Sequence, residues 1–127
     1  MRSTTVLLIA DDNEATVLAA ALAKRPDVRV IEAPDGPHAI RLVETQAAPA
    51  LAIGTAAVLA KPVDELVKIL DARGIPLIVV AAGLPPMVKQ RALAAGVREI
   101  HDRPRDWSAY SELIETATRR LIRKLER

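Results

Sequence analysis

Three pairs of residues that could do chemistry each follow a short apolar run: Asp11 with Asp12, Gly54 with Thr55, and Arg103 with Pro104. Two adjacent carboxylates can ligate a divalent cation or accept hydrogen bonds from an arginine. A threonine hydroxyl becomes a nucleophile only beside a general base. These residues could therefore bind a cation, form ion pairs, or accept a transferred group such as phosphoryl on the threonine hydroxyl oxygen.

Asp11 and Asp12 allow two interpretations. In the first, they hold Mg²⁺ weakly, because no third anionic ligand accompanies them. In the second, which we favour, Asp12 or Asn13 caps a helix and Asp11 forms an ion pair. The Arg103 guanidinium can bridge both carboxylates or remain solvated. We expect the bridge, because two neighbouring acids otherwise repel each other.

No pattern in the sequence predicts catalysis. No general base is evident beside Thr55, and His38 and His101 stand apart without further metal ligands, so we expect both on the surface. Each glycine stands alone, so no phosphate-binding loop is present. The absence of cysteine excludes thiol catalysis and is typical of a reducing compartment. We predict a protein that is not an enzyme and needs no cofactor, with Trp107 packing a helix end.

The elements that must position these residues alternate between strand and helix. Apolar runs predict five strands: Val6–Ala10, Val28–Ile31, Leu51–Ile53, Leu77–Val80 and Val97–Ile100. Helical spacing predicts five helices: from Asp12 or Asn13 to about Lys24, from Pro37 onward, from Pro62 to near Gly74, from Pro86 to Ala95, and from beyond Asp106. This alternation indicates one α/β domain, a doubly wound sheet of five parallel strands with helices on both faces. The carboxyl ends of the strands should then bring the three pairs together.

Charge and composition narrow the classes of partner. Residues 119–127 hold five Lys or Arg against one Glu, whereas the other 118 residues hold 13 against 15 Asp or Glu. We expect a body over residues 5–118 and a basic helical extension over 119–127, within a single domain of 127 residues. These five positive charges are not accompanied by a recognition helix or another element that contacts bases. They therefore predict no nucleic-acid binding beyond weak contacts with phosphates. Apolar runs are too short for a membrane span, and the start is no signal peptide, so we expect a cytoplasmic protein.

Residues 5–118 resemble the receiver domain of bacterial two-component response regulators. The family's Asp pair after the first strand is matched by Asp11 and Asp12, and its Lys-Pro after the fifth strand by Arg103 and Pro104. Its Ala-x-Asp-Gly-x-x-Ala-Leu-x-Leu pattern is matched over 33–42, and its Ala-Leu-x-Ala-Gly-Ala helix end over 92–97. The resemblance implies a flavodoxin-like fold.

The resemblance also implies that phosphorylation is lost in this chain. Receivers accept a phosphoryl group on an Asp at the end of the third strand, which falls on Thr55, or on Gly54 if the alignment slides by one. Three other functional positions are replaced as well: the hydroxyl after the fourth strand by Ala81, the Lys by Arg103, and the aromatic switch residue by Ile100. The family's Lys-Pro bond is commonly cis, so the resemblance implies a cis bond before Pro104.

Together these features predict a non-phosphorylatable pseudo-receiver that acts as a protein-interaction module in a bacterial signalling pathway. The alternative is a receiver that stays active through an unconventional acceptor or a small ligand in the strand-end crevice. The last two helices and the fifth strand are the expected contact surface. The partner would be a signalling protein or, weakly, a second copy of the chain. The expected interface residues are Ile100, Tyr110, Leu121, Ile122 and Leu125.

Overall fold

Strands and helices alternate through the described residues of a computed structural model. It describes residues 4–24, 27–45, 49–59 and 63–125, without the side chains of residues 12–14, 57, 107, 122, 124 and 125. The strands are β1 (Thr4–Ile9), β2 (Val28–Ala33), β3 (Leu51–Gly54), β4 (Leu77–Ala81) and β5 (Glu99–Asp102). The helices are α1 (Asp12–Leu22), α2 (Gly36–Thr45), the 3₁₀ turn η1 (Ala56–Leu59), α3 (Val63–Ala72), α4 (Pro86–Ala95) and α5 (Trp107–Leu125).

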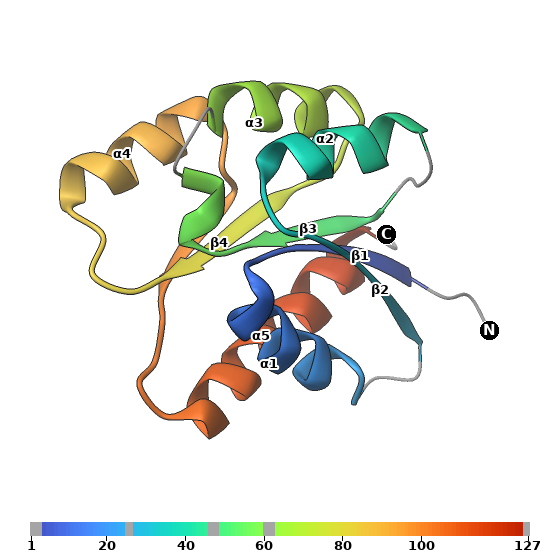
Figure 1. Ribbon diagram of the computed structural model, residues 1–127, viewed down its shortest axis with the longest axis vertical. Coiled ribbons are helices and arrows are strands. Elements are labelled where there is room, and N and C mark those ends of the chain that lie inside the picture. Colours follow the sequence, from blue (N-terminus) through green and yellow to red (C-terminus); the bar gives the residue numbers. More distant parts are fainter. Residues whose placement is uncertain (1–3, 25–26, 46–48, 60–62, 126–127) are drawn as a thin grey trace.

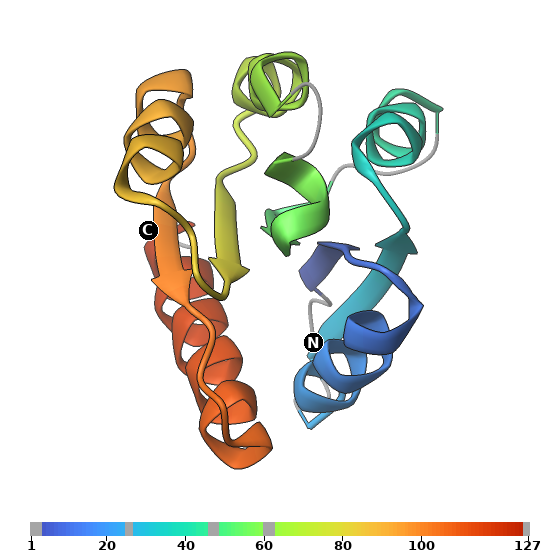
Figure 2. The same cartoon turned by 60° about the vertical axis from the view of Figure 1, so that its left-hand side comes forward.

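The five strands form one parallel sheet in the order β2-β1-β3-β4-β5. Helices α2, α3 and α4 cover one face of the sheet, and α1 and α5 cover the other (Figures 1 and 2). The predicted doubly wound, flavodoxin-like fold is confirmed. From β1 the chain passes first to β2 on one side and then to β3 on the other. The change of direction lies between β1 and β3, where sheets of this kind place their functional crevice.

Alternating side chains give the sheet two aliphatic cores. Leu7 and Ile9 of β1 pack under α2, α3 and α4, whereas Val6 and Leu8 pack against α1 and α5, and all four are fully buried. The strands are therefore apolar on both faces, as parallel strands covered on both sides require.

The last strand begins later than the predicted run Val97–Ile100. Helix α4 ends at Gly96, whose φ of 119° lies in the left-handed region. The Gly96 amide donates to the Leu93 carbonyl and the Val97 amide to the Ala92 carbonyl, which closes a Schellman motif. Val97 is therefore held by the helix end, and β5 starts at Glu99.

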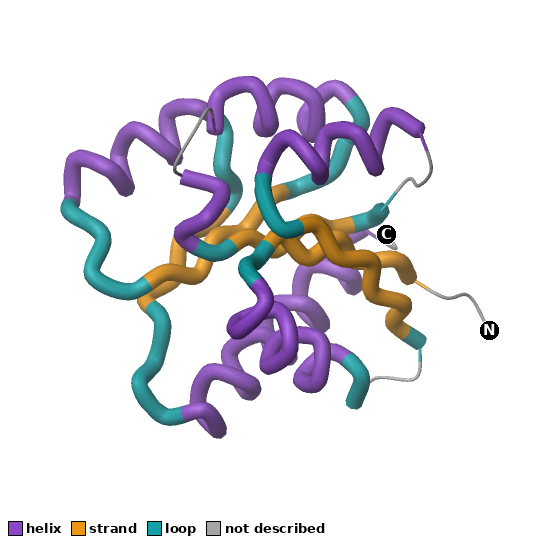
Figure 3. The backbone as a smooth tube through the Cα atoms, viewed as in Figure 1, coloured by secondary structure: helices purple, strands orange, loops and turns teal. Residues whose placement is uncertain are grey.

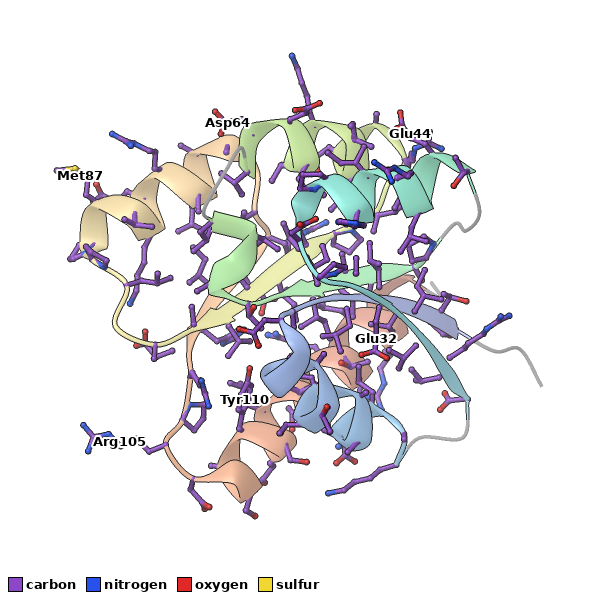
Figure 4. All side chains as sticks on the ribbon, in the orientation of Figure 1. Glu32, Glu44, Asp64, Met87, Arg105 and Tyr110 are labelled. Carbon is purple, nitrogen blue, oxygen red and sulfur yellow. The ribbon has the colours of Figure 1, made fainter. Side chains whose placement is uncertain are left out.

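Helix α5 is amphipathic, and its apolar face belongs to the core beneath the sheet. Tyr110 is fully buried between the sheet and the α1/α5 layer, where Figure 4 labels it, and Leu121 is 4 % exposed. The prediction that these two residues contact a partner is wrong, because the chain's own core covers them. Ile100 is half-buried and packs on the opposite core, and the side chains of Ile122 and Leu125 lie outside the described set. No helix in the described ranges is long and apolar enough to cross a membrane.

Replacing Thr118 by valine should stabilise the protein. Thr118 is fully buried, and its Oγ1 has no hydrogen-bond partner among the described residues. A buried, unsatisfied hydroxyl costs free energy that an apolar group of the same shape does not. We expect T118V to raise the free energy of unfolding by about 1 kcal/mol in urea titrations. T116V, at an exposed position on the same helix, is the control. An equal or larger gain in T116V would contradict this expectation.

Candidate functional site

Four residues from separate strands meet at the carboxyl edge of the sheet. Asp11 follows β1, Thr55 follows β3, Ala81 ends β4 and Arg103 follows β5. The Thr55 amide donates to the Ile9 carbonyl at 3.1 Å, and the Arg103 amide donates to the Ala81 carbonyl at 3.2 Å. The loops after β4 and β5 leave the sheet at this same edge (Figure 3). The backbone therefore gathers the residues that the sequence singles out at the strand ends.

The geometry favours Thr55 over Gly54 as the residue at the acceptor position. Gly54 is the last residue of β3 and pairs with Ile9. A Cβ at Gly54 would lie 2.7 and 2.9 Å from the two Cγ atoms of Val58, so position 54 points into the core. Thr55 is the first residue beyond the strand, and it is only 2 % exposed. The residue predicted at the acceptor position is thus a buried threonine.

A 3₁₀ turn that the sequence analysis did not predict fills the space beside this position. The amide of Val58 donates to the Thr55 carbonyl at 3.1 Å, which starts η1 directly after the strand. Val58 is 1 % exposed and belongs to the core beneath α2, α3 and α4. The only signal for this turn is the all-apolar stretch 56–60, which suits a segment folded onto the core.

The Arg103 side chain lies over an aromatic ring of the core between the sheet and helices α1 and α5. Its guanidinium carbon lies 5.3 Å from the centroid of the Tyr110 ring, within the range of a cation–π interaction. Arg103 is half-buried, whereas Arg105, two residues on, points into solvent (Figure 4). The pairing of Arg103 with Asp11 or Asp12 stays a prediction, and the Asp12 side chain lies outside the described set.

The predicted cis bond before Pro104 is wrong. None of the described peptide bonds is cis, and both Arg103 and Pro104 are described. The trans isomer is intrinsically the more stable one for an X–Pro bond.

Ion pairs attach β5 to the helices on both faces of the sheet. Glu99 accepts hydrogen bonds from Arg120 of α5 and pairs with His101 at 2.8 Å. Asp102 accepts one from Lys89 of α4 at 3.1 Å. Because side chains alternate along a strand, Glu99 and His101 lie on the α5 side and Asp102 on the α4 side. His101 therefore has a structural partner, and exposed His38 pairs with Asp35 at 2.7 Å at the start of α2.

The Glu99 pairs should make stability depend on pH. Partial burial raises the pKa of Glu99, but the hydrogen bonds from His101 and Arg120 outweigh it and hold the pKa below its ordinary value of 4.5. A carboxyl with a lowered folded-state pKa stabilises the fold above its unfolded pKa, and this contribution is lost as the pH falls below about 4.5.

We expect E99Q to lower the urea midpoint at pH 7 and to match the parent more closely as the pH is lowered below 4.5. The control is E112Q, which removes an exposed acid from α5, the helix that carries Arg120, the arginine bound to Glu99. A constant difference between E99Q and the parent across this pH range would show that the pair is not the cause.

The donor set at the strand-end edge does not suit a tight Mg²⁺ site. No group of three His, Cys, Asp or Glu side chains that could hold a metal ion exists among those described. Position 55 contributes a buried threonine, which leaves the neighbouring acids Asp11 and Asp12 as the only carboxylates of the predicted site. Mg²⁺ prefers a rigid octahedral oxygen shell, which two adjacent acids complete only with waters. Weak binding at this pair stays a prediction.

Comparison with known proteins identifies solved structures that share this fold. No protein-family model and no curated protein matches the sequence. Solved structures do match: the phosphorylated cyanobacterial phytochrome response regulator RcpA aligns with a TM-score of 0.77 and 15 % identity over 91 % of both chains. A Thermotoga maritima response regulator aligns with a TM-score of 0.76 and 15 % identity over 94 % of this chain and 98 % of its own. A receiver domain from Rhodospirillum rubrum aligns with a TM-score of 0.73 and 16 % identity over 90 % of both. The chain therefore has the fold of a response-regulator receiver domain.

Proposed function

We propose that this protein is a pseudo-receiver, a module that binds a partner in a cytoplasmic bacterial signalling pathway and does not accept a phosphoryl group. The fold of response-regulator receivers supports the signalling role. The observation that carries the loss of phosphorylation is the buried Thr55 at the acceptor position. Phosphoryl transfer from a phosphohistidine favours a carboxylate acceptor, and the hydroxyl of a buried threonine is a much weaker nucleophile.

The strand-end edge supports the same proposal from three further positions. Ala81 supplies no hydroxyl to grip a phosphoryl group, and Arg103 rests on Tyr110. The Val58 side chain occupies the space that a side chain at position 54 would need, so an acidic residue would not fit there without rearrangement. A receiver switches because the phosphoryl group rearranges this edge. A site with these replacements keeps one arrangement.

The partner surface that we propose comprises α4, β5 and the outer face of α5. Met87 is 69 % exposed and Leu93 is 49 % exposed, and they are the large hydrophobic side chains exposed among the described residues. Both belong to α4, whose only fully buried residue is Ala92. Met87 projects away from the body at the outer end of α4 (Figure 4). A helix that contributes little to its own core and presents two large apolar side chains is suited to a partner contact.

The interaction role is tested by photo-cross-linking in the native host. A photoreactive amino acid placed at Met87 or Leu93 should give a discrete adduct with one signalling protein or with a second copy of the chain. The matched control is the same label at Asp64, an exposed residue on α3, which Figure 4 also labels. Adducts of equal yield at Asp64, or none at Met87 and Leu93, would contradict the proposed surface.

A further inference from the structure

Four residues of α5 line a hollow on its outer face. Thr116, Arg119, Arg120 and Arg123 border a volume of about 220 Å³. Their spacing of three, four and seven residues places them on one stripe of the helix. All four are exposed, and the stripe lies opposite the apolar face that packs under the sheet. We call this feature the arginine hollow.

The arginine hollow carries more positive charge than its neighbours neutralise. Arg120 is held by Glu99, and Arg119 reaches Glu115 only at 3.8 Å. Arg123 forms no ion pair within the described residues. Arg119 and Arg123 are four residues apart, and like charges at this spacing repel each other. An anion in the hollow would relieve this repulsion.

The chemistry of the lining points to one class of ligand. A guanidinium presents planar pairs of N–H donors that suit phosphate and carboxylate oxygens. A threonine hydroxyl can donate a further hydrogen bond. The volume of about 220 Å³ is large enough to hold two linked phosphate groups beside these side chains. We propose that the arginine hollow binds a compact diphosphate-type anion, either inorganic or carried by a nucleotide.

Neither the helix dipole nor membrane binding accounts for all of these arginines. Cations near a helix C-terminus offset the macrodipole, but this effect is confined to the last turn, and α5 ends at Leu125, so Arg119 lies outside its range. A basic amphipathic helix binds membranes through an exposed apolar face, but the apolar face of α5 is buried against the sheet.

The test is calorimetric titration of the full chain with inorganic pyrophosphate, with ATP and with a short DNA duplex, all at low ionic strength without Mg²⁺. We expect pyrophosphate and ATP to bind with one site each. R119Q/R123Q should weaken both by at least about tenfold. Arg120 is left unchanged because it holds Glu99. Equal affinities for the two probes would assign recognition to the phosphates. ATP binding that is tighter than the binding of inorganic triphosphate, which has the same number of phosphates, would identify a nucleotide as the source.

The matched control is R73Q/R91Q, which removes two exposed arginines away from α5 and changes the net charge equally. It should keep the parent affinity within about twofold. Equal weakening in R73Q/R91Q would overturn the proposal, because net charge alone would then explain the binding. Binding of the duplex without binding of pyrophosphate would overturn it in favour of nucleic acid, and no binding of any probe would also overturn it. Urea midpoints of both variants check that each is folded.

Discussion

Incubation with a small phosphodonor and Mg²⁺ should leave the intact mass of the protein unchanged. In the proposed alignment the acceptor position holds Thr55, which is 2 % exposed, and Ala81 replaces the hydroxyl that grips the phosphoryl group in receivers. Without a carboxylate no acyl phosphate forms, and beryllofluoride has no oxygen ligand of the usual kind. Against a working receiver, which gains one phosphoryl group under these conditions, we expect essentially complete loss. A stoichiometric acyl phosphate on this chain, recognised by its cleavage with hydroxylamine, would contradict the proposed function.

The alignment of this chain with the receiver phosphorylation site can be tested by restoring the side chains that the site lacks. T55D/A81T/R103K places carboxylate, hydroxyl and ammonium at the positions that we propose for them, and we expect it to gain phosphoryl mass. The matched control is G54D/A81T/R103K, in which the carboxylate moves one residue back. It should gain none and should lose stability, because a side chain at Gly54 meets Val58 at 2.7 Å. Phosphorylation of the G54D variant alone would show that Gly54, and not Thr55, occupies the acceptor position.

Gly96→Ala should be the most destabilising single-methyl substitution in the connection between α4 and β5. Gly96 has a φ of 119°, and an added Cβ would lie 2.7 Å from Val67 Cγ1 and 2.9 Å from Asp71 Oδ2. The unfavourable backbone conformation and the steric overlap each cost free energy, and together they should lower the free energy of unfolding by about 2–4 kcal/mol. Urea titration followed by circular dichroism measures this loss.

Gly74→Ala is the matched control, because Gly74 follows the end of α3 as Gly96 follows the end of α4. Its φ is 71°, and no heavy atom lies within 4 Å of an added Cβ. Only the backbone penalty applies there, so the loss should be about 1 kcal/mol. If both variants lose the same stability, the contact of position 96 with Val67 and Asp71 is not the cause.

Much of this molecule follows from local patterns. The runs at Leu77–Ala81 and Pro86–Ala95 show why: a strand covered on both faces must be continuously apolar, and a helix that begins with proline and ends before glycine is bounded by backbone preferences. The start of β5 differs from the predicted one because the hydrogen bonds of Gly96 and Val97 depend on the helix before them, and not on the hydropathy of Val97.

Candidate surface residues are less predictable than strands. Tyr110 and Leu121 continue the apolar stripe of α5, and periodicity alone does not say whether such a stripe meets the chain's own sheet or a partner. The exposed pair Met87 and Leu93 lies on a helix whose stripe is weak, so the sequence pattern does not single it out. Only packing shows which apolar side chains are left uncovered.

The order of residues along the chain is enough to predict alternating strands and helices, and it shows that neither Gly54 nor Thr55 carries a carboxylate. Both conclusions depend on residue identity and on spacing along the chain, which are local properties. Three other features are visible only in the folded molecule. Val58 occupies the space that a side chain at position 54 would need, Arg103 lies on the Tyr110 ring, and the bond before Pro104 is trans. These outcomes depend on contacts between residues that the local pattern does not bring together, where packing at close range selects one arrangement from several that the pattern allows.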